Sequence, residues 1–406
     1  MARTQLALGL SFLLVSAAIA EDWPQLLGPS RNATWRGAAI RSDWDARPPK
    51  TLWRKKTGLG YSCPVIAKGK IILFHRIDAE EIVECLDRDT GNTLWKFAYP
   101  TKFRDGTHLD DGPRSTPAID SDRVYSYGAE GWLHCLDLNT GKKIWGFDAK
   151  TKFKADRRWH GMISSPLIEG NALLLNVGST NAAGIVAFNK IDGSTLWKST
   201  SDKFTGSSPV CADIEGKRCA VFVTPGFLVG IEPGTGKEQF RTPWGTTAYS
   251  AVMASSPVIV SNSIFVSAQY GVGGTLFKIA HGCATKIWNT SELSTHYQTA
   301  IYKDGYLYAS DGHQAEVSSL RCVDLATGKV QWSNEELGAS NQVLANDDLF
   351  LLTQRGELIL ASVSPKGLKI KARTHILSHL VRAYPALSDG FLVGRSQGEM
   401  VCLDLR

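Results

Sequence analysis

The sequence predicts an all-β protein folded as an eight-bladed β-propeller of four-stranded antiparallel blades. Three observations predict it. One marker phrase recurs along the chain, a second marker recurs independently at a similar spacing, and an unmatched strand near the beginning complements a strand missing at the end. Repeats of about 40–50 residues are typical of propellers and solenoids, in which each unit buries its faces against its neighbours.

The composition agrees with a β-rich globular protein. Of the 406 residues, 43% are apolar and 21% are charged, as in ordinary folded domains. Glycine (38) and tryptophan (12) are abundant, which indicates many tight turns and large aromatic side chains. The net charge of +6 is not concentrated in a Lys/Arg cluster, and this argues against nucleic-acid binding.

The first twenty residues differ from the rest of the chain. Arg3 supplies a positive charge, residues 6–18 form an apolar run, and Ala18-Ile19-Ala20 matches a cleavage site. The predicted organisation is a signal peptide, an N-terminal surface segment and a propeller, at residues 1–20, 21–42 and 43–406. We expect an exported protein, periplasmic or secreted and soluble after cleavage, with no membrane span.

The first marker is an apolar strand followed by a turn with the letters TG and then an aromatic residue. Six copies end at Trp95, Trp145, Trp197, Phe240, Trp288 and Trp332. A degenerate copy ends at Ile370, and the chain stops within an eighth copy, MVCLDLR, before its turn. This marker therefore counts eight units.

The second marker is a small or aromatic residue before a short apolar strand, as in SCPVI, STPAI and SSPLI. Its reference positions are Pro64, Pro117, Pro166, Pro209, Pro257, Ala300, Val343 and Pro385. Their average spacing is about 46 residues, which is the length of a propeller blade. Both markers thus give the same number of units.

One unit illustrates the expected blade. Four strands are predicted at residues 116–120, 123–128, 132–137 and 142–147. Ser121-Asp122, Glu130-Gly131 and Asn139-Thr140-Gly141 separate them and have the composition of tight turns. Four antiparallel strands in this length describe one blade of a propeller.

The two ends of the chain complement each other. The eighth unit lacks its fourth strand, whereas residues 51–57 (TLWRKKT) are an unmatched copy of that strand. We therefore expect the N-terminal strand to complete the last blade and close the ring, which removes an open sheet edge.

The marker sequence resembles a known repeat family. The segment from Asp87 to Trp95 (DRDTGNTLW), with relatives beginning at Asp137 and Asp324, is similar to the pyrroloquinoline-quinone (PQQ) repeat. No G-H and W-D pair frames the repeats, which argues against a WD40 propeller. The resemblance runs from about residue 43 to the C-terminus, and the layout is most similar to small exported eight-bladed proteins related to the outer-membrane assembly factor BamB.

The resemblance implies a structural role for the aromatic residues. In the family, the tryptophan of one blade docks against the neighbouring blade. The residues that would do so are Trp53, Trp95, Trp145, Trp197, Trp288 and Trp332. Phe240, Ile370 and the missing glycine before Trp288 depart from the pattern, which implies less regular blades at those positions.

The same resemblance raises a catalytic alternative, a PQQ- and Ca²⁺-dependent quinoprotein dehydrogenase. Such enzymes hold Ca²⁺ with a Glu/Asn/Asp set and often place a disulfide between adjacent cysteines beside the cofactor. The chain has no adjacent Cys-Cys pair, and no Glu/Asn/Asp set aligns with that ligand motif. We therefore expect no cofactor and no metal, with PQQ and calcium as the alternative.

The eight cysteines have two interpretations. Cys85, Cys135, Cys322 and Cys402 fall at the same position of four different units, where we expect small buried apolar side chains. Cys211 and Cys219 flank one hairpin, so a disulfide between them remains open.

The loops before the innermost strands surround one mouth of the central channel. The candidate site residues in these loops are Tyr61, Arg114, Arg158, Trp159, His160, His296, Tyr297, Arg382 and Tyr384. Arginines and histidines beside aromatic rings favour an anionic or planar ligand. Alternatively, these are ordinary loop residues, some of them paired with Asp110, Asp111 and Asp156.

The sequence thus favours an exported, non-catalytic propeller that acts as a scaffold for another protein or for a small anionic ligand at the channel mouth. We expect a monomer that binds no nucleic acid. Loops on a rigid scaffold are sufficient for such a function.

Overall fold

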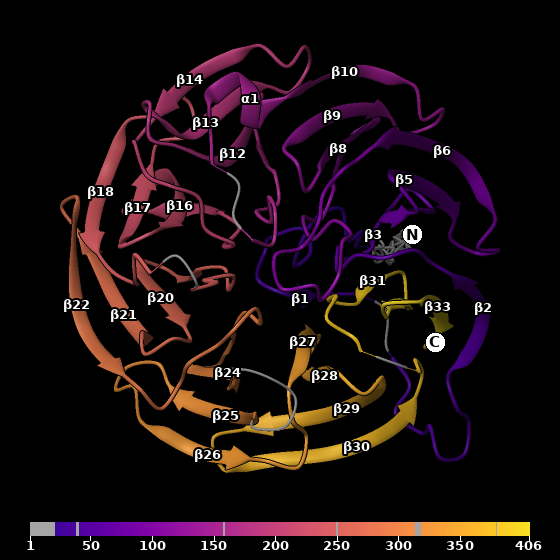
Figure 1. Ribbon diagram of the computed structural model, residues 1–406. Helices are drawn as coiled ribbons and strands as arrows, with labels where there is room; N and C mark the ends of the chain where they lie inside the picture. The colour runs from indigo at the N-terminus through magenta and orange to yellow at the C-terminus, as the bar shows by residue number, and fades with distance from the viewer. Residues whose placement is uncertain (1–20, 38–39, 157–158, 249–250, 313–317, 379) are drawn as a thin grey trace, which may run out of the picture.

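A ring of eight antiparallel sheets confirms the predicted fold (Figure 1). The computed structural model describes residues 21–37, 40–156, 159–248, 251–312, 318–378 and 380–406. The predicted signal peptide, residues 1–20, lies outside the described residues. Among the described residues, the one helix is the short α1 (Ala149–Phe153) after blade 2.

Each blade has an inner, a second, a third and an outer strand. The inner strands are β3 (Val65–Ala67), β7 (Ala118–Asp120), β11 (Leu167–Glu169), β15 (Val210–Ile214), β19 (Val258–Val260), β23 (Ile301–Lys303), β27 (Ser340–Ala345) and β31 (Ala386–Ser388). The second strands are β4 (Lys70–Ile77), β8 (Arg123–Tyr127), β12 (Ala172–Ser179), β16 (Lys217–Thr224), β20 (Ser263–Ala268), β24 (Tyr306–Asp311), β28 (Asp348–Thr353) and β32 (Phe391–Arg395). The third strands are β5 (Glu80–Asp87), β9 (Trp132–Asp137), β13 (Ala183–Asn189), β17 (Phe227–Ile231), β21 (Gly273–Ala280), β25 (Ser319–Asp324), β29 (Glu357–Ser364) and β33 (Glu399–Asp404). The outer strands are β6 (Thr93–Pro100), β10 (Lys143–Asp148), β14 (Thr195–Ser199), β18 (Glu238–Pro243), β22 (Cys283–Thr290), β26 (Val330–Asn334), β30 (Gly367–His375) and β2 (Lys50–Lys56). Blades 1 to 8 follow this order.

The ring closes as the sequence predicts. Strand β2, from the N-terminal part of the chain, pairs antiparallel with β33 at the C-terminus, so blade 8 has the order β2-β33-β32-β31 (Figure 1). Arg395, fully buried on blade 8, donates to the carbonyl oxygens of Ser62 and Phe74 on blade 1, at 3.0 and 2.9 Å. The first and last blades are therefore joined by a covalent path and by buried hydrogen bonds.

A β-bulge interrupts the pairing of the third and outer strands in every blade. In blade 1, Cys85 pairs with Trp95 and Leu86 with Thr93, so Leu94 is the extra residue. The same shift occurs in the other seven blades. A bulge redirects side chains locally, and here it adjoins the residue that reaches the next blade.

The tryptophans hold each blade to the next. The Trp95 indole N–H donates to the Leu138 carbonyl oxygen at 2.9 Å, and its ring lies against the Gly141 backbone of blade 2. The other indole N–H groups that donate to a backbone carbonyl of the following blade belong to Trp53, Trp145, Trp197, Trp288 and Trp332. The glycine of the TG turn is required because a Cβ at Gly141 would lie 2.6 Å from Trp95 Cδ2.

Blade 7 departs from this pattern. The residue paired with Leu360, at the position that Trp95 occupies in blade 1, is Ala372 and not Ile370. Ile370 is 37% exposed. Blade 8 takes its outer strand, β2, from the N-terminal part of the chain, so no TG turn joins its third and outer strands, and the alanine leaves no partner missing.

A second set of contacts between blades explains the second sequence marker. The hydroxyl of Thr116 accepts a hydrogen bond from the Cys63 N–H of blade 1, at 3.1 Å. Ser165 accepts from the Thr116 N–H, and Ser208 from the Ser165 N–H, both at 2.9 Å. Thr299 accepts from the Ser256 N–H at 3.0 Å. In these four contacts, the small polar residue before an inner strand satisfies a buried backbone donor of the preceding blade.

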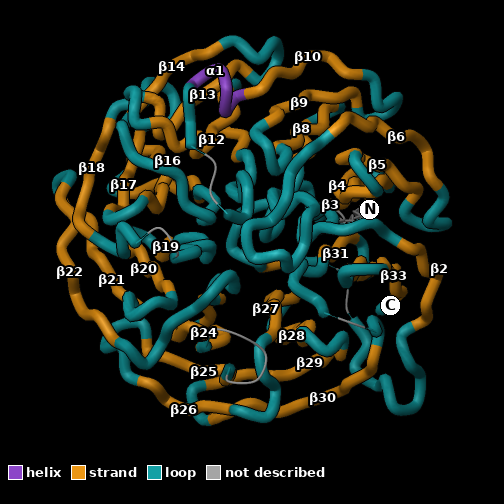
Figure 2. Tube along the Cα trace, viewed as in Figure 1, coloured by secondary structure: helices purple, strands orange, loops and turns teal. Residues whose placement is uncertain are grey.

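The N-terminal segment was predicted to lie on the surface over residues 21–42, but its described part is anchored in the core by several buried side chains. Trp23 and Trp35 are fully buried, and the segment runs inside the ring (Figures 1 and 2). Trp23 exchanges backbone hydrogen bonds with Ile66 of blade 1, and β1 (Thr34–Trp35) pairs in parallel with β27 of blade 7. The sequence pattern concealed this position because the segment matches no blade repeat.

A buried arginine anchors this segment to two more blades. Arg31 is 3% exposed and donates to the carbonyl oxygens of Pro209, at 3.0 Å, and Pro166. Burial lowers the pKa of the guanidinium to about 9. Because these acceptors belong to blades 4 and 3, the segment bonds to inner-strand regions on both sides of the channel and closes it internally.

The cysteines are all free in the structure. Cys85, Cys135, Cys322 and Cys402 are buried, in agreement with their predicted packing role. Cys211 pairs with Ala220, and Ala212 pairs with Cys219. Because adjacent residues of a strand point to opposite faces, the two cysteines of this hairpin do not face each other.

Replacing Gly141 with alanine tests the contact between tryptophan and glycine. Gly141 has φ +70°, and its Cβ would clash with Trp95, whereas Gly216 has φ +71° and nothing within 4 Å of a Cβ. We expect Gly141→Ala to lower the free energy of unfolding by about 1–3 kcal/mol more than Gly216→Ala, because only the first adds overpacking to the backbone strain. Urea unfolding measures both. Equal losses would contradict the docking role of Trp95.

Replacing Trp23 with alanine tests whether the N-terminal segment is part of the core. We expect a loss of about 3–5 kcal/mol in the free energy of unfolding, as for a fully buried tryptophan. Trp132 is 38% exposed and is the matched control, with an expected change of about 1 kcal/mol or less. Thermal and urea denaturation give both values. A Trp23→Ala variant as stable as Trp132→Ala would show that the segment does not stabilise the ring.

Candidate functional site

A cavity of about 440 Å³ lies at the channel mouth where the inner strands begin. Eight of the nine predicted site residues line it: Tyr61, Arg114, Trp159, His160, His296, Tyr297, Arg382 and Tyr384. The ninth, Arg158, lies outside the described residues. Leu26 of the N-terminal segment also lines the cavity. Because that segment fills the ring beyond it, the cavity opens at the mouth and not into a continuous channel.

Tyr61 lies between two guanidinium groups. The Arg382 guanidinium carbon is 5.2 Å from the centre of the Tyr61 ring, and that of Arg114 is 5.4 Å from it. Arg382 is also 5.9 Å from the centre of the Tyr297 ring. Such cation–π contacts orient a guanidinium without neutralising its charge. Burial raises the pKa of Tyr61, which keeps the phenol neutral.

The two arginines differ in their acidic partners. Arg114 Nη2 lies 3.3 Å from Asp105 Oδ1, so its charge is compensated. Among the described residues no carboxylate pairs with Arg382, and its buried Nε has no hydrogen-bond partner. Arg382 is therefore an uncompensated cation on the cavity wall.

Asp105 organises one side of the cavity. Its Oδ1 lies 2.6 Å from His160 Nδ1, and its Oδ2 accepts from the Thr107 hydroxyl at 2.7 Å and from the Leu109 N–H at 2.9 Å. Burial alone would raise the pKa of Asp105, but these donors and Arg114 outweigh it and hold the pKa well below its ordinary value. The ionised carboxylate fixes the position of both His160 and Arg114.

Asp110, Asp111 and Asp156, which the sequence suggested as partners, do not form ion pairs with Arg114, His160 or Arg382 in the described residues. Asp110 accepts from the N–H groups of Gly60 and Gly112, and Asp111 pairs with Arg104. Among the described residues, Asp156 forms no ion pair with a predicted site residue. The sequence did not single out Asp105 because the letters around it, FRDGT, have the composition of a turn.

The remaining predicted residues form an aromatic wall. Tyr384 is 4% exposed and accepts from the Thr299 N–H at 2.6 Å. The hydroxyl of Tyr297 accepts a hydrogen bond from Gln354, and burial raises the pKa of Tyr297 to about 12. His296 Nε2 lies 3.0 Å from the hydroxyl of Tyr270, a lining residue that the sequence did not indicate.

Three hydroxyl groups of the contacts between blades also line the cavity. They belong to Thr116, Ser165 and Ser208 on blades 2, 3 and 4. In the sequence these residues served only as a repeat marker. Their position before the inner strand was the available signal, because that strand begins at the channel mouth.

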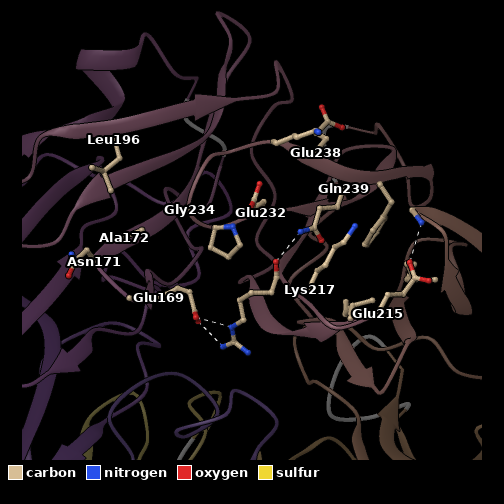
Figure 3. A pocket seen from close by; sticks show the side chains of 18 residues that line it. Glu169, Asn171, Ala172, Leu196, Glu215, Lys217, Glu232, Gly234, Glu238 and Gln239 are labelled. Carbon is tan, nitrogen blue, oxygen red and sulfur yellow. Dashed lines mark hydrogen bonds and ion pairs between the residues drawn. The ribbon is translucent and has the colours of Figure 1, made fainter.

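A second hollow lies on blades 3 to 5 and has a different character (Figure 3). It measures about 790 Å³. Glu169 forms a two-pronged ion pair with Arg218 at 2.8 and 2.7 Å, and Glu215 accepts from the His281 N–H at 2.7 Å. The carboxylates of Glu169 and Glu215 are therefore satisfied within the protein.

The described residues contain neither a cluster of metal ligands nor a membrane-spanning helix. Within the described ranges, no group of three or more His, Cys, Asp or Glu side chains could hold a metal ion. No helix in the described part of the chain has the length and apolar character to cross a membrane.

Comparison with protein families gives one match. The family model described as outer membrane protein assembly factor BamB matches residues 79–334, more than half of the chain. Comparison with curated proteins gives no match.

Solved structures of two functional classes share the fold. BamB from Moraxella catarrhalis is 15% identical with a TM-score of 0.64, covering 88% of this chain and 98% of that one. Quinohemoprotein alcohol dehydrogenase from Comamonas testosteroni is 12% identical with a TM-score of 0.67, covering 95% and 80%. A europium-containing methanol dehydrogenase is 12% identical with a TM-score of 0.69, covering 93% and 90%. At these identities the likeness shows the fold alone.

Replacing Asp105 with asparagine tests its role as the organiser of the site. We expect a loss of about 3–5 kcal/mol in the free energy of unfolding at pH 7, because a buried cation loses its partner. The folded-state pKa of Asp105 is lowered. Its stabilisation is therefore present above the ordinary carboxyl pKa, about 3.9, and is lost as the pH falls below it.

The control for this variant is Asp89→Asn, which removes an exposed ion pair with Arg88 and should cost about 0–1 kcal/mol. Urea unfolding between pH 3 and pH 7 measures the difference from wild type. A loss for Asp105→Asn that does not shrink with falling pH would contradict the ionised state of this carboxyl group.

Proposed function

Because the chain belongs to the family described as outer membrane protein assembly factor BamB, we propose that it is a non-catalytic binding propeller. Its channel-mouth cavity takes a small anionic ligand or an acidic segment of a partner protein. We further propose that the protein is exported and acts as a monomer outside the cytoplasm.

The observation that carries this proposal is the uncompensated charge of Arg382. The guanidinium lies between the rings of Tyr61 and Tyr297 on the cavity wall, with no carboxylate partner among the described residues. A guanidinium with free donors recognises carboxylate and phosphate groups through charge-assisted hydrogen bonds. An anion in the cavity would supply the missing partner.

The ring supports a binding role in a second way. The contacts between blades fix the inner strands, and the loops before these strands carry the cavity residues. Rigid elements that present side chains from several loops are suited to recognition. The fold alone does not decide between binding and catalysis, because propellers with either function share it.

The residues of the cavity do not fit the quinoprotein alternative. Ca²⁺ binds six to eight oxygen ligands, among them carboxylates. The described residues that line the cavity include no Asp or Glu, and they include Arg114 and Arg382. Asp105 lies behind the wall and is saturated by four donors. A divalent cation would therefore meet positive charge, and we derive no step through PQQ and calcium.

Replacing Arg382 with alanine tests the proposed site. Hexaglutamate, inorganic phosphate and small carboxylates are titrated calorimetrically into the purified protein at low salt. We expect at least one of these anions to bind, with a Kd that rises with salt because the charge is screened. Arg382→Ala should weaken that binding by about 10-fold or more, and should change the free energy of unfolding by only about 1 kcal/mol.

The control variant is Arg373→Ala, which removes a guanidinium from outer strand β30, where it pairs with Glu357. It should leave anion binding unchanged. Equal binding by wild type and Arg382→Ala would exclude the cavity as the anion site. Ca²⁺-dependent binding of PQQ together with reduction of an electron acceptor would replace the proposed function by the dehydrogenase alternative.

A further inference from the structure

The cavity has hydrogen-bond donors that no protein atom uses. Thr116, Ser165 and Ser208 are 1%, 2% and 3% exposed. Each hydroxyl oxygen accepts from a backbone N–H of the preceding blade, which orients the side chain. The Thr116 hydroxyl also bonds to the side chain of Cys63, whereas no acceptor among the described residues takes the O–H of Ser165 or Ser208. The contacts that hold the blades together therefore leave two oriented donors, on residues that line the cavity.

Two further buried donors in the cavity also lack an acceptor. The buried hydroxyl of Tyr61 and the buried Nε of Arg382 have no partner among the described residues. A buried donor without an acceptor costs about 1–3 kcal/mol. The lining contains no Asp, Glu, Asn or Gln among the described residues. The unused polar capacity of the cavity thus consists mainly of donors, and it calls for a ligand rich in acceptors.

This distribution separates ligand classes. A sugar presents hydroxyl groups that both donate and accept, and the described lining offers them no carboxylate or side-chain amide oxygen as an acceptor. A carboxylate only accepts and brings the negative charge that Arg382 lacks. The donors therefore favour an oxyanion over a neutral saccharide.

The rim of the cavity carries exposed, largely apolar side chains. Trp159 is 47% exposed, Leu109 46% and Tyr270 37%, and all three line the cavity. Exposed large apolar side chains around a cavity mark surface that a ligand can cover. Aromatic rings favour flat partners in stacked or edge-to-face contact. The body of the ligand should be flat and apolar.

We propose that the cavity binds a small aromatic carboxylic acid. This proposal rests on the proposed function and specifies its ligand. The carboxylate pairs with Arg382, oxygen acceptors of the ligand take the hydroxyl protons of Ser165 and Ser208, and the ring stacks on the aromatic wall. The cavity volume of about 440 Å³ suits a small molecule.

The test uses 2-naphthoate as the probe and 2-naphthamide as its neutral analogue of the same shape. Glucuronate supplies a carboxylate on a sugar. Calorimetry and ligand-observed NMR on the purified protein measure binding. We expect one 2-naphthoate per chain, with the amide and glucuronate each about 10-fold weaker or more. Equal affinity for naphthoate and either analogue would overturn the proposal.

A matched pair of variants tests the hydroxyl groups. Ser208→Ala and Ser207→Ala each remove a buried hydroxyl that bonds to a neighbouring blade. Ser208 accepts from the Ser165 N–H at 2.9 Å and Ser207 donates to the Ser255 carbonyl oxygen at 2.8 Å, but only Ser208 lines the cavity. Both should lower the melting temperature to a similar extent. Ser208→Ala should weaken 2-naphthoate binding by about 3–10-fold, while Ser207→Ala leaves it unchanged. Equal effects of the two variants on binding would overturn the role of the hydroxyl.

Failure of this inference can be told apart from failure of the proposed function. If hexaglutamate or phosphate binds in an Arg382-dependent manner and 2-naphthoate does not, the ligand class is wrong and the anion site stands. If no anion binds in an Arg382-dependent manner, both proposals fail.

Discussion

The structure depends on the contact of each blade with the next. A four-stranded sheet has two faces to cover, and in a ring only the neighbouring blades can cover them. Near the outer strands, tryptophan rings such as Trp95 lie on a turn glycine and donate to a backbone carbonyl. Near the axis, hydroxyl groups such as Ser165 accept from a backbone N–H. The two markers that recur along the sequence supply the residues that make these two contacts.

The same ring geometry gives the N-terminal segment its place. Eight short inner strands around one axis leave backbone groups facing a central space that strands alone do not fill. The segment supplies Trp23 and Arg31 there, and it bonds to blades 1, 3, 4 and 7. The open channel of the ring thereby becomes a cavity at one mouth, with Leu26 in its lining.

The chemistry of that cavity follows from the division of charge around it. Asp105 satisfies Arg114 and His160, so these residues form a neutralised wall. Arg382 lies opposite Tyr61 and lacks such a partner among the described residues. The asymmetry favours an anion and disfavours a metal ion.

The sequence by itself determined the number of blades, their strand order and the closure by residues 51–57, because repeats and alternating apolar residues record local pairing. It also placed eight of the lining residues at one opening, since every loop before an inner strand reaches the same mouth. The burial of Trp23, Arg31 and Trp35, the pairing of Arg114 with Asp105 and the isolation of Arg382 among the described residues were decided only by the tertiary structure. These features depend on contacts between segments that belong to no repeat. The positions of such segments along the chain do not predict which of them come into contact.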